Sequence, residues 1–235
     1  MSGSLKISIV CVVVVLASLP VVLHTQSIGG GFRRENLDLP YDSNAHLSED
    51  EEANIVQFYG ANYETDAIFF CLDQSMSMGR GQWEALQREL ARVVTQFSTN
   101  VEFGIVFFHA ETTAFPPNKR PAKATKSMKA AAIQMVKSTS ASNKSTCVLA
   151  GLTDALTMAN RSSVERRSIV FMSDGKATCA GEDPVGYIKK TFSQTRNLNS
   201  KRIPIHTVGI GFEVIEYFLK KISNESGGSY RRLTK

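Results

Sequence analysis

The sequence has little cysteine, little histidine and only one long apolar run. Four cysteines and four histidines occur among 235 residues, and none forms a CxxC pair or a Cys/His spacing typical of zinc sites. The composition excludes a disulfide-stapled miniprotein, a disordered tail protein and a polytopic transporter. No paired nucleophile and base is visible either. With 43% hydrophobic and 21% charged residues, the chain instead predicts one globular domain with an extension.

The single apolar run lies near the N-terminus. Residues 7–23 carry no charge, and this run is longer than a typical signal-peptide core and just long enough for a membrane-spanning helix. We therefore expect residues 1–27 to be a signal peptide or a signal-anchor transmembrane segment. The following domain is then membrane-anchored or secreted, on the extracytoplasmic side. No lipobox is present, because Cys11 comes too early in the run.

Residues 28–60 have the composition of a linker, with glycines and polar side chains at its start. Towards its end, Ser48 and Glu51 have the spacing of a helix capping box, and apolar residues from Ile55 onward follow at helical spacing. This pattern predicts a short helix near 48–58. We expect that helix to cover one face of the domain that follows.

From residue 67 onward, apolar strands alternate with amphipathic helices. Strand-like runs occupy residues 67–72, 101–108, 112–115, 168–172, 203–210 and 229–233. Helical stripes occupy residues 83–97, 128–136, 148–156, 185–192 and 214–222. The alternation predicts an α/β fold with a doubly wound, mainly parallel sheet and helices on both faces. Two neighbouring strands, 101–108 and 112–115, are too close for a crossover and predict one antiparallel edge strand.

Polar side chains follow two of the apolar strands where each strand ends. Asp73, Ser75 and Ser77 follow the first strand at alternate positions. Asp174 follows a second strand, and Thr146 precedes a helix in a loop that the alternation places at the same edge. Because ligands of open α/β sheets bind beyond the carboxyl ends of the strands, we expect these side chains to form one site. Two carboxylates and three hydroxyls suit Mg²⁺, Mn²⁺ or Ca²⁺ rather than zinc.

These residues carry a resemblance to a known family. From about residue 67 to residue 233 the chain resembles a von Willebrand factor type A (VWA) domain, which has a Rossmann-like fold. The Asp-x-Ser-x-Ser motif at 73–77 matches the family's metal-ion-dependent adhesion site (MIDAS), and Thr146 and Asp174 match its threonine and its last aspartate. The region from 206 to 230 is similar to bacterial members. We therefore assign residues 61–235 to a VWA domain.

The resemblance also implies roles for the five residues. The hydroxyls of Ser75, Ser77 and Thr146 would touch one ion, Mg²⁺ or alternatively Mn²⁺ or Ca²⁺, while Asp73 and Asp174 would act directly or through water. The family binds proteins, often through an acidic side chain of the partner. The resemblance thus implies a metal-dependent adhesion or protein-binding module that is not an enzyme.

The sequence departs from the family pattern in two places. Lys144 and Ser145 precede Thr146, where the family usually has glycine. The chain ends at Lys235, just after the last predicted strand, whereas adhesion members that switch affinity have a further helix there. Affinity switching by that helix is therefore left open.

Two alternative functions also remain open. The domain is structural, with a metal site that no longer binds, or it is a phosphohydrolase, although Ser75 stands where haloacid-dehalogenase-like phosphatases need a second aspartate. No nucleic-acid partner is expected, because the basic stretch at 119–129 lacks interleaved aromatic residues. Cys147 and Cys179 fall in loops that the fold can bring together, and the sequence leaves open whether they form a disulfide.

Overall fold

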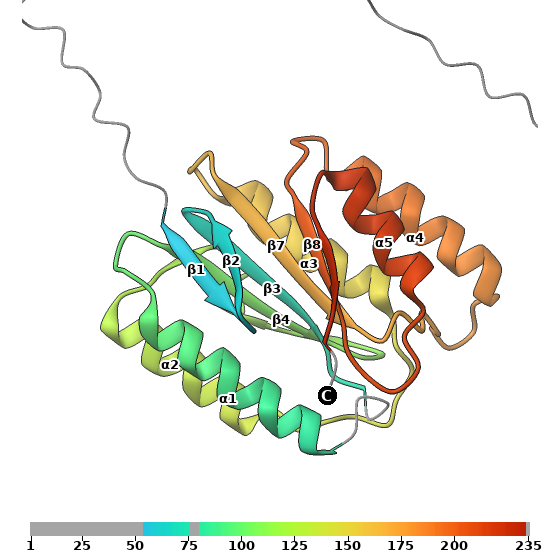
Figure 1. Ribbon diagram of the computed structural model, residues 1–235, viewed down its shortest axis with the longest axis horizontal. Helices are drawn as coiled ribbons and strands as arrows, with labels where there is room; N and C mark the ends of the chain where they lie inside the picture. Colours follow the sequence, from blue (N-terminus) through green and yellow to red (C-terminus); the bar gives the residue numbers. More distant parts are fainter. Residues whose placement is uncertain (1–53, 76–79, 234–235) are drawn as a thin grey trace, which may run out of the picture. The chain divides into compact units, whose positions relative to one another are not determined.

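The computed structural model describes residues 54–75 and 80–233 (Figure 1). The strands are β1 (Ile55–Phe58), β2 (Ala61–Glu64), β3 (Ala67–Asp73), β4 (Glu102–Phe108), β5 (Thr112–Phe115), β6 (Ala122–Lys123), β7 (Arg167–Ser173), β8 (Ile205–Gly209) and β9 (Tyr230–Arg232). The helices are α1 (Arg80–Gln96), α2 (Lys126–Ser138), α3 (Val148–Arg161), α4 (Pro184–Leu198) and α5 (Glu216–Ser226).

A seven-stranded sheet forms the centre of this fold. Its strand order is β5-β4-β3-β7-β8-β9, with the two-residue β6 also paired to β4. The strands β4, β3, β7, β8 and β9 run parallel, whereas β5 and β6 are antiparallel to β4. The predicted doubly wound, mainly parallel α/β fold with an antiparallel edge strand is therefore confirmed; the short β6 was not predicted.

The central strand β3 explains why its sequence reads as one continuous apolar run. It lies between two parallel neighbours, β4 and β7, and all seven of its residues are buried. Side chains alternate between the two faces, so that Phe70 packs in one core and Phe69 in the other. Each face of the sheet is therefore covered by its own layer of helices.

We call these coverings the front layer and the back layer. The front layer consists of α1, α2 and the β1–β2 hairpin, and the back layer consists of α3, α4 and α5. Figure 1 shows α1 and α2 on one side of the sheet and the other three helices on the opposite side. The five predicted helical stripes correspond to these five helices.

The predicted helix near 48–58 is wrong for the part that the structure describes. Residues 55–58 form β1, which pairs antiparallel with β2 through a two-residue turn at Tyr59 and Gly60. Both turn residues have positive φ, 49° and 76°, as a type I′ hairpin turn requires. Alternate residues Val56 and Phe58 are buried in the front core, so the period is that of a strand. The segment covers a face of the sheet as expected, but as a hairpin.

The predicted signal or anchor, residues 1–27, and most of the linker lie outside the described residues. Within the part that the structure describes, no helix is long and apolar enough to cross a membrane. The assignment of residues 1–27 therefore stays a prediction.

Candidate functional site

The carboxyl end of β3 places a fully buried aspartate at the edge of the sheet. Asp73 Oδ1 accepts a hydrogen bond from the backbone N–H of Ser75 at 2.8 Å, and Oδ2 accepts one from the Ser173 hydroxyl at 2.8 Å. Burial raises the pKa of Asp73 to about 6, while the hydrogen bonds from Ser75 and Ser173 oppose that rise and the charge of Asp174 adds to it. Both oxygens are thus used to hold the neighbouring loops.

The carboxyl end of β7 contributes the second aspartate. Asp174 is buried, and its Oδ1 accepts a hydrogen bond from the N–H of Lys176 at 2.9 Å. Its carbonyl accepts one from the N–H of Ile215 at 2.8 Å, which ties this loop to the segment before α5. The next residue, Gly175, has φ +81°, and a Cβ there would lie 2.7 Å from the Ile215 carbonyl oxygen. Only glycine allows this close approach.

Ser173 joins the two strand ends and is a further residue of this edge, beyond the five predicted from the sequence. Its hydroxyl donates to Asp73 and accepts a hydrogen bond from the N–H of Gly175 at 3.0 Å. The only sequence signal is its place as the last residue of an apolar strand, directly before Asp174. Ser173 therefore fixes the relative position of the two carboxylates.

Thr146 lies in the loop between α2 and α3. Its N–H donates to the carbonyl of Thr178 at 2.8 Å, and the two residues form an antiparallel bridge. The adjacent Cys147 forms a disulfide with Cys179 and donates its N–H to the carbonyl of His109 at 2.8 Å. The disulfide that the sequence left open is thus present. It connects the Thr146 loop to the loop that follows Asp174.

The remaining two predicted residues follow Asp73. Ser75 is buried and forms a parallel bridge with Ser142, whose N–H also donates to the carbonyl of Gln74 at 2.7 Å. Ser77 lies outside the described residues. The structure therefore places Asp73, Ser75, Thr146 and Asp174 in connected loops at the carboxyl edge, and it does not describe the fifth side chain.

The donor set at this edge fits a hard cation. Residues 54–75 and 80–233 contain no group of three or more His, Cys, Asp or Glu side chains arranged for a metal. A cation here would rely on hydroxyls with the two carboxylates, as Mg²⁺ and Mn²⁺ do with oxygen ligands. Among the described residues only one oxygen of Asp174 has a hydrogen bond, whereas Asp73 uses both. Asp174 is thus better suited than Asp73 to contact an ion or its water.

Comparisons with known proteins agree with this architecture. Residues 67–234 match the family described as von Willebrand factor type A domain. Human inter-alpha-trypsin inhibitor heavy chain H4 is 25% identical over 210 residues, which cover 84% of this chain and 22% of that protein. This chain therefore corresponds to a small part of that relative.

Two bacterial structures share the fold. A von Willebrand factor type A structure from Catenulispora acidiphila has a TM-score of 0.62 and 17% identity, covering 74% of this chain and 40% of the other. An aerotolerance-related membrane protein from Bacteroides fragilis has a TM-score of 0.54 and 17% identity, covering 72% and 92%. At these identities the likeness concerns the fold.

Proposed function

Because the chain belongs to the von Willebrand factor type A family, we propose that it is an interaction module that binds a protein partner through one divalent cation. VWA domains are generally interaction modules rather than enzymes, and many bind a cation at the MIDAS. The observation that supports the proposal is that the segments carrying Asp73, Ser75, Thr146 and Asp174 are linked to one another by hydrogen bonds and the disulfide. The ion is Mg²⁺, or alternatively Mn²⁺ or Ca²⁺.

Each residue has a separate role in this proposal. The hydroxyls of Ser75, Ser77 and Thr146 hold the ion, and Asp174 contacts it directly or through water. Asp73 accepts one hydrogen bond from the N–H of Ser75 and one from the hydroxyl of Ser173, and so positions the Ser75 loop against the end of β7. The other ligands are neutral hydroxyls, and the two carboxylates at most neutralise a divalent ion. The bound cation can therefore still accept an acidic side chain of the partner as a further oxygen ligand.

Apolar side chains beside the site support a protein partner. Phe212 and Tyr217 are 71% and 70% exposed, and Ile215 is 44% exposed. The N–H of Ile215 binds the carbonyl of Asp174, so this apolar group adjoins the proposed ion. Exposed apolar patches commonly mark interaction surfaces. A partner with an acidic side chain next to apolar residues fits both features.

The disulfide supports an extracytoplasmic location. Disulfides such as Cys147–Cys179 persist in oxidising compartments and are rare in the cytosol. This agrees with residues 1–27 being a signal peptide or membrane anchor, and one structural relative is described as a membrane protein.

The likeness of residues 206–230 to bacterial members of the family stays a prediction.

Retention of a partner on the immobilised full chain tests the proposal. We expect proteins to be retained in Mg²⁺ and released by EDTA, and Asp174→Asn to abolish the retention. Asp183→Asn is the matched control, because Asp183 caps α4 through the N–H of Gly186 and asparagine caps a helix equally well.

Calorimetry distinguishes the alternative functions. Titration of the full chain with Mg²⁺ and Mn²⁺ should give one ion per chain. If neither ion binds, the domain is structural with an inactive metal site. Turnover in a broad phosphatase screen that disappears in Asp73→Asn would favour the phosphohydrolase instead.

A further inference from the structure

A cavity lies in the back layer, between α4 and α5. It has a volume of about 650 Å³, within the range of small-molecule sites. The two helices meet through Phe192 and Phe218, whose ring centroids are 5.3 Å apart, and the cavity extends from there towards their C-terminal ends. Helices of parallel α/β units run opposite to the strands. The cavity therefore reaches the amino end of β8, away from the proposed metal site.

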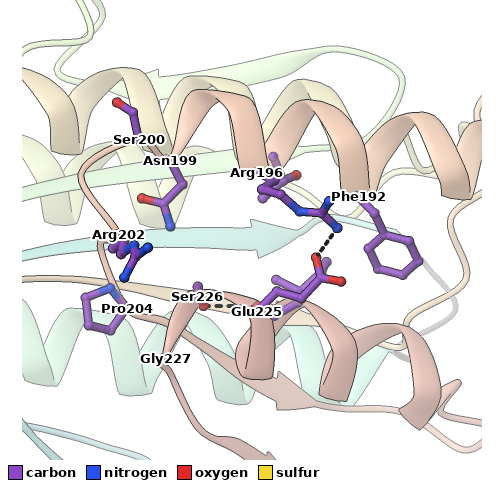
Figure 2. Close-up of a pocket in the computed structure, with 11 residues that line it drawn as sticks. Phe192, Arg196, Asn199, Ser200, Arg202, Pro204, Glu225, Ser226 and Gly227 are labelled. Atoms are coloured by element: carbon purple, nitrogen blue, oxygen red, sulfur yellow. Dashed lines mark hydrogen bonds and ion pairs between the residues drawn. The ribbon is translucent and has the colours of Figure 1, made fainter.

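The wall formed by α4 and the following loop is strongly basic. Residues 184–205 contain five Lys or Arg residues and no Asp or Glu. Two of them, Arg196 and Arg202, line the cavity. Arg196 forms an ion pair with Glu225 at 3.2 Å across the groove, as Figure 2 shows.

Arg202 has no such partner. It forms no ion pair or side-chain hydrogen bond with any residue in 54–75 or 80–233, and its backbone is held in the left-handed region at φ 51°. Figure 2 shows its side chain beside Asn199 and Pro204 at one end of the cavity, with Phe192 at the other end. A guanidinium without a counter-charge on a concave surface favours an anionic ligand.

A buried hydroxyl on the same cavity also has no partner. Thr195 is only 7% exposed, and its Oγ1 has no hydrogen-bond partner among the described residues. Buried polar atoms are rarely left unpaired, so each such atom needs an explanation. Asn199, by contrast, is fully engaged, because its side chain both donates to and accepts from the backbone of Ile203. Thr195 thus lines the cavity with an unpaired hydroxyl, whereas the side chain of Asn199 is held by the backbone and shapes the wall.

The remaining charges do not cancel this positive field. Glu225 is shared between Arg196 and Lys221, whose Nζ lies 3.0 Å from its carboxylate. Each of the two helix ends adds about half a negative charge, but the last carbonyls accept hydrogen bonds, including those from the N–H groups of Asn199 and Gly228. Among the side chains that line the cavity, Arg196 is paired with Glu225, so the one positive charge left without a counter-charge is that of Arg202.

We propose that this cavity binds a small organic anion, a carboxylate or a phosphate ester with an apolar body. Arg202 pairs with the acidic group in the fork geometry that suits both oxyanions. The Thr195 hydroxyl forms a hydrogen bond to the same molecule. Its apolar body lies against Phe192 and Ile222, which line the cavity. The site is independent of the proposed metal-dependent function.

Calorimetric titration of the full chain with three probes of one shape tests the proposal. The probes are 2-naphthoate, 2-naphthyl phosphate and the neutral 2-naphthalenemethanol, with inorganic phosphate as a fourth arm. We expect at least one naphthyl anion to bind with one molecule per chain. The neutral analogue should bind with an affinity at least about tenfold lower. The carboxylate and phosphate arms show which oxyanion the cavity prefers.

Two variants assign the binding to the cavity. Arg202→Gln should lower the affinity for the anion about tenfold or more. Arg120→Gln should leave that affinity unchanged, because Arg120 is an exposed residue in the loop after β5. Thr195→Val keeps the shape and should weaken binding without lowering the melting temperature, since it removes an unpaired buried hydroxyl.

Three results would overturn the proposal. The first is no binding of either naphthyl anion, and the second is equal affinity in Arg202→Gln and Arg120→Gln. The third is inorganic phosphate binding as tightly as 2-naphthyl phosphate, which would show that the apolar wall takes no part.

Discussion

The front and back layers hold the same sheet in different ways. The front layer relies on apolar burial, with Phe58 and Phe97 from the hairpin and the end of α1 packed around Phe70 of β3. The back layer also buries apolar side chains, but it carries the disulfide at the start of α3 and the loop of Asp174. The comparison indicates that the front layer mainly stabilises the fold, while the back layer also fixes the proposed site.

Removal of a front-layer aromatic should give the largest effect. Phe70→Ala takes a fully buried ring out of the contact between β3, β1 and the end of α1, and should lower the free energy of unfolding by about 3–5 kcal/mol. Urea unfolding measures this change. Phe212→Ala is the matched control, because that side chain is 71% exposed and its loss should cost little. Equal losses of unfolding free energy in the two variants would contradict the proposed role of the front layer in stabilising the fold.

Removal of the back-layer disulfide should have the next largest effect. The double variant Cys147→Ser/Cys179→Ser releases a loop closed over a sequence separation of 32 residues, and should lower stability by about 2–4 kcal/mol. It should also weaken cation binding, because the disulfide holds the loop of Thr146. Thermal unfolding and calorimetry measure the two changes. As a control, reductant should destabilise the parent protein but not the variant. Unchanged cation affinity in the variant would show that the disulfide does not contribute to the cation site.

Cation binding should contribute a smaller increment, confined to the carboxyl edge. At a Mg²⁺ concentration a hundredfold above its Kd, the parent protein should gain about 2.7 kcal/mol of stability. Asp174→Asn should abolish this gain and leave the stability in EDTA nearly unchanged, since asparagine can still accept from the N–H of Lys176. Thermal melts with and without Mg²⁺ decide the point. A full Mg²⁺ response in Asp174→Asn would exclude this residue from the ion site.

The smallest effect should arise where the hairpin meets the sheet. His206 of β8 contacts the ring of Tyr63 at 4.9 Å, and its burial lowers its pKa below the ordinary 6.5. The unfolded chain therefore binds a proton more readily than the folded one near this pH. This contribution to stability is fully present above pH 6.5 and is lost as the pH falls towards the lowered pKa.

His206→Gln should make stability between pH 7.5 and pH 5.5 less dependent on pH. Urea unfolding of both proteins at several pH values, in EDTA, measures the free energy of unfolding as a function of pH. The contributions of other titrating groups cancel when the two profiles are subtracted. Parallel pH profiles for the two proteins would mean that His206 does not couple the hairpin to pH.

Most of the sheet and its helices could be predicted because their patterns are local. The apolar run of β3 and the helical stripe of α1 each depend on one element only, because the spacing of apolar residues indicates which faces of that strand or helix are buried. The hairpin differs from the predicted helix because the capping-box pattern at Ser48 and Glu51 favours a helix that continues into Ile55, where the structure has β1. In the fold, pairing with β2 and the turn at Gly60 determine that segment.

The proposed site divides in the same way. Asp73 and Asp174 could be placed at one edge from sequence, because the carboxyl ends of parallel strands share an edge. The hydrogen bond from Ser173 to Asp73 could not be predicted, because the shared edge indicates which strand ends are close but not which of their polar atoms pair.

The sequence alone predicts the α/β alternation, the mainly parallel sheet and the oxygen-rich character of its carboxyl edge. These follow from periodicity and from where polar residues interrupt apolar strands. The folded structure was needed to show that residues 55–64 form a hairpin, that Cys147 joins Cys179 and that a cavity lies between α4 and α5. The disulfide and the cavity depend on contacts between residues far apart in the chain, which leave no local pattern. The hairpin pairs neighbouring residues, but it is held in place by the packing of Phe58 against Phe70 of β3.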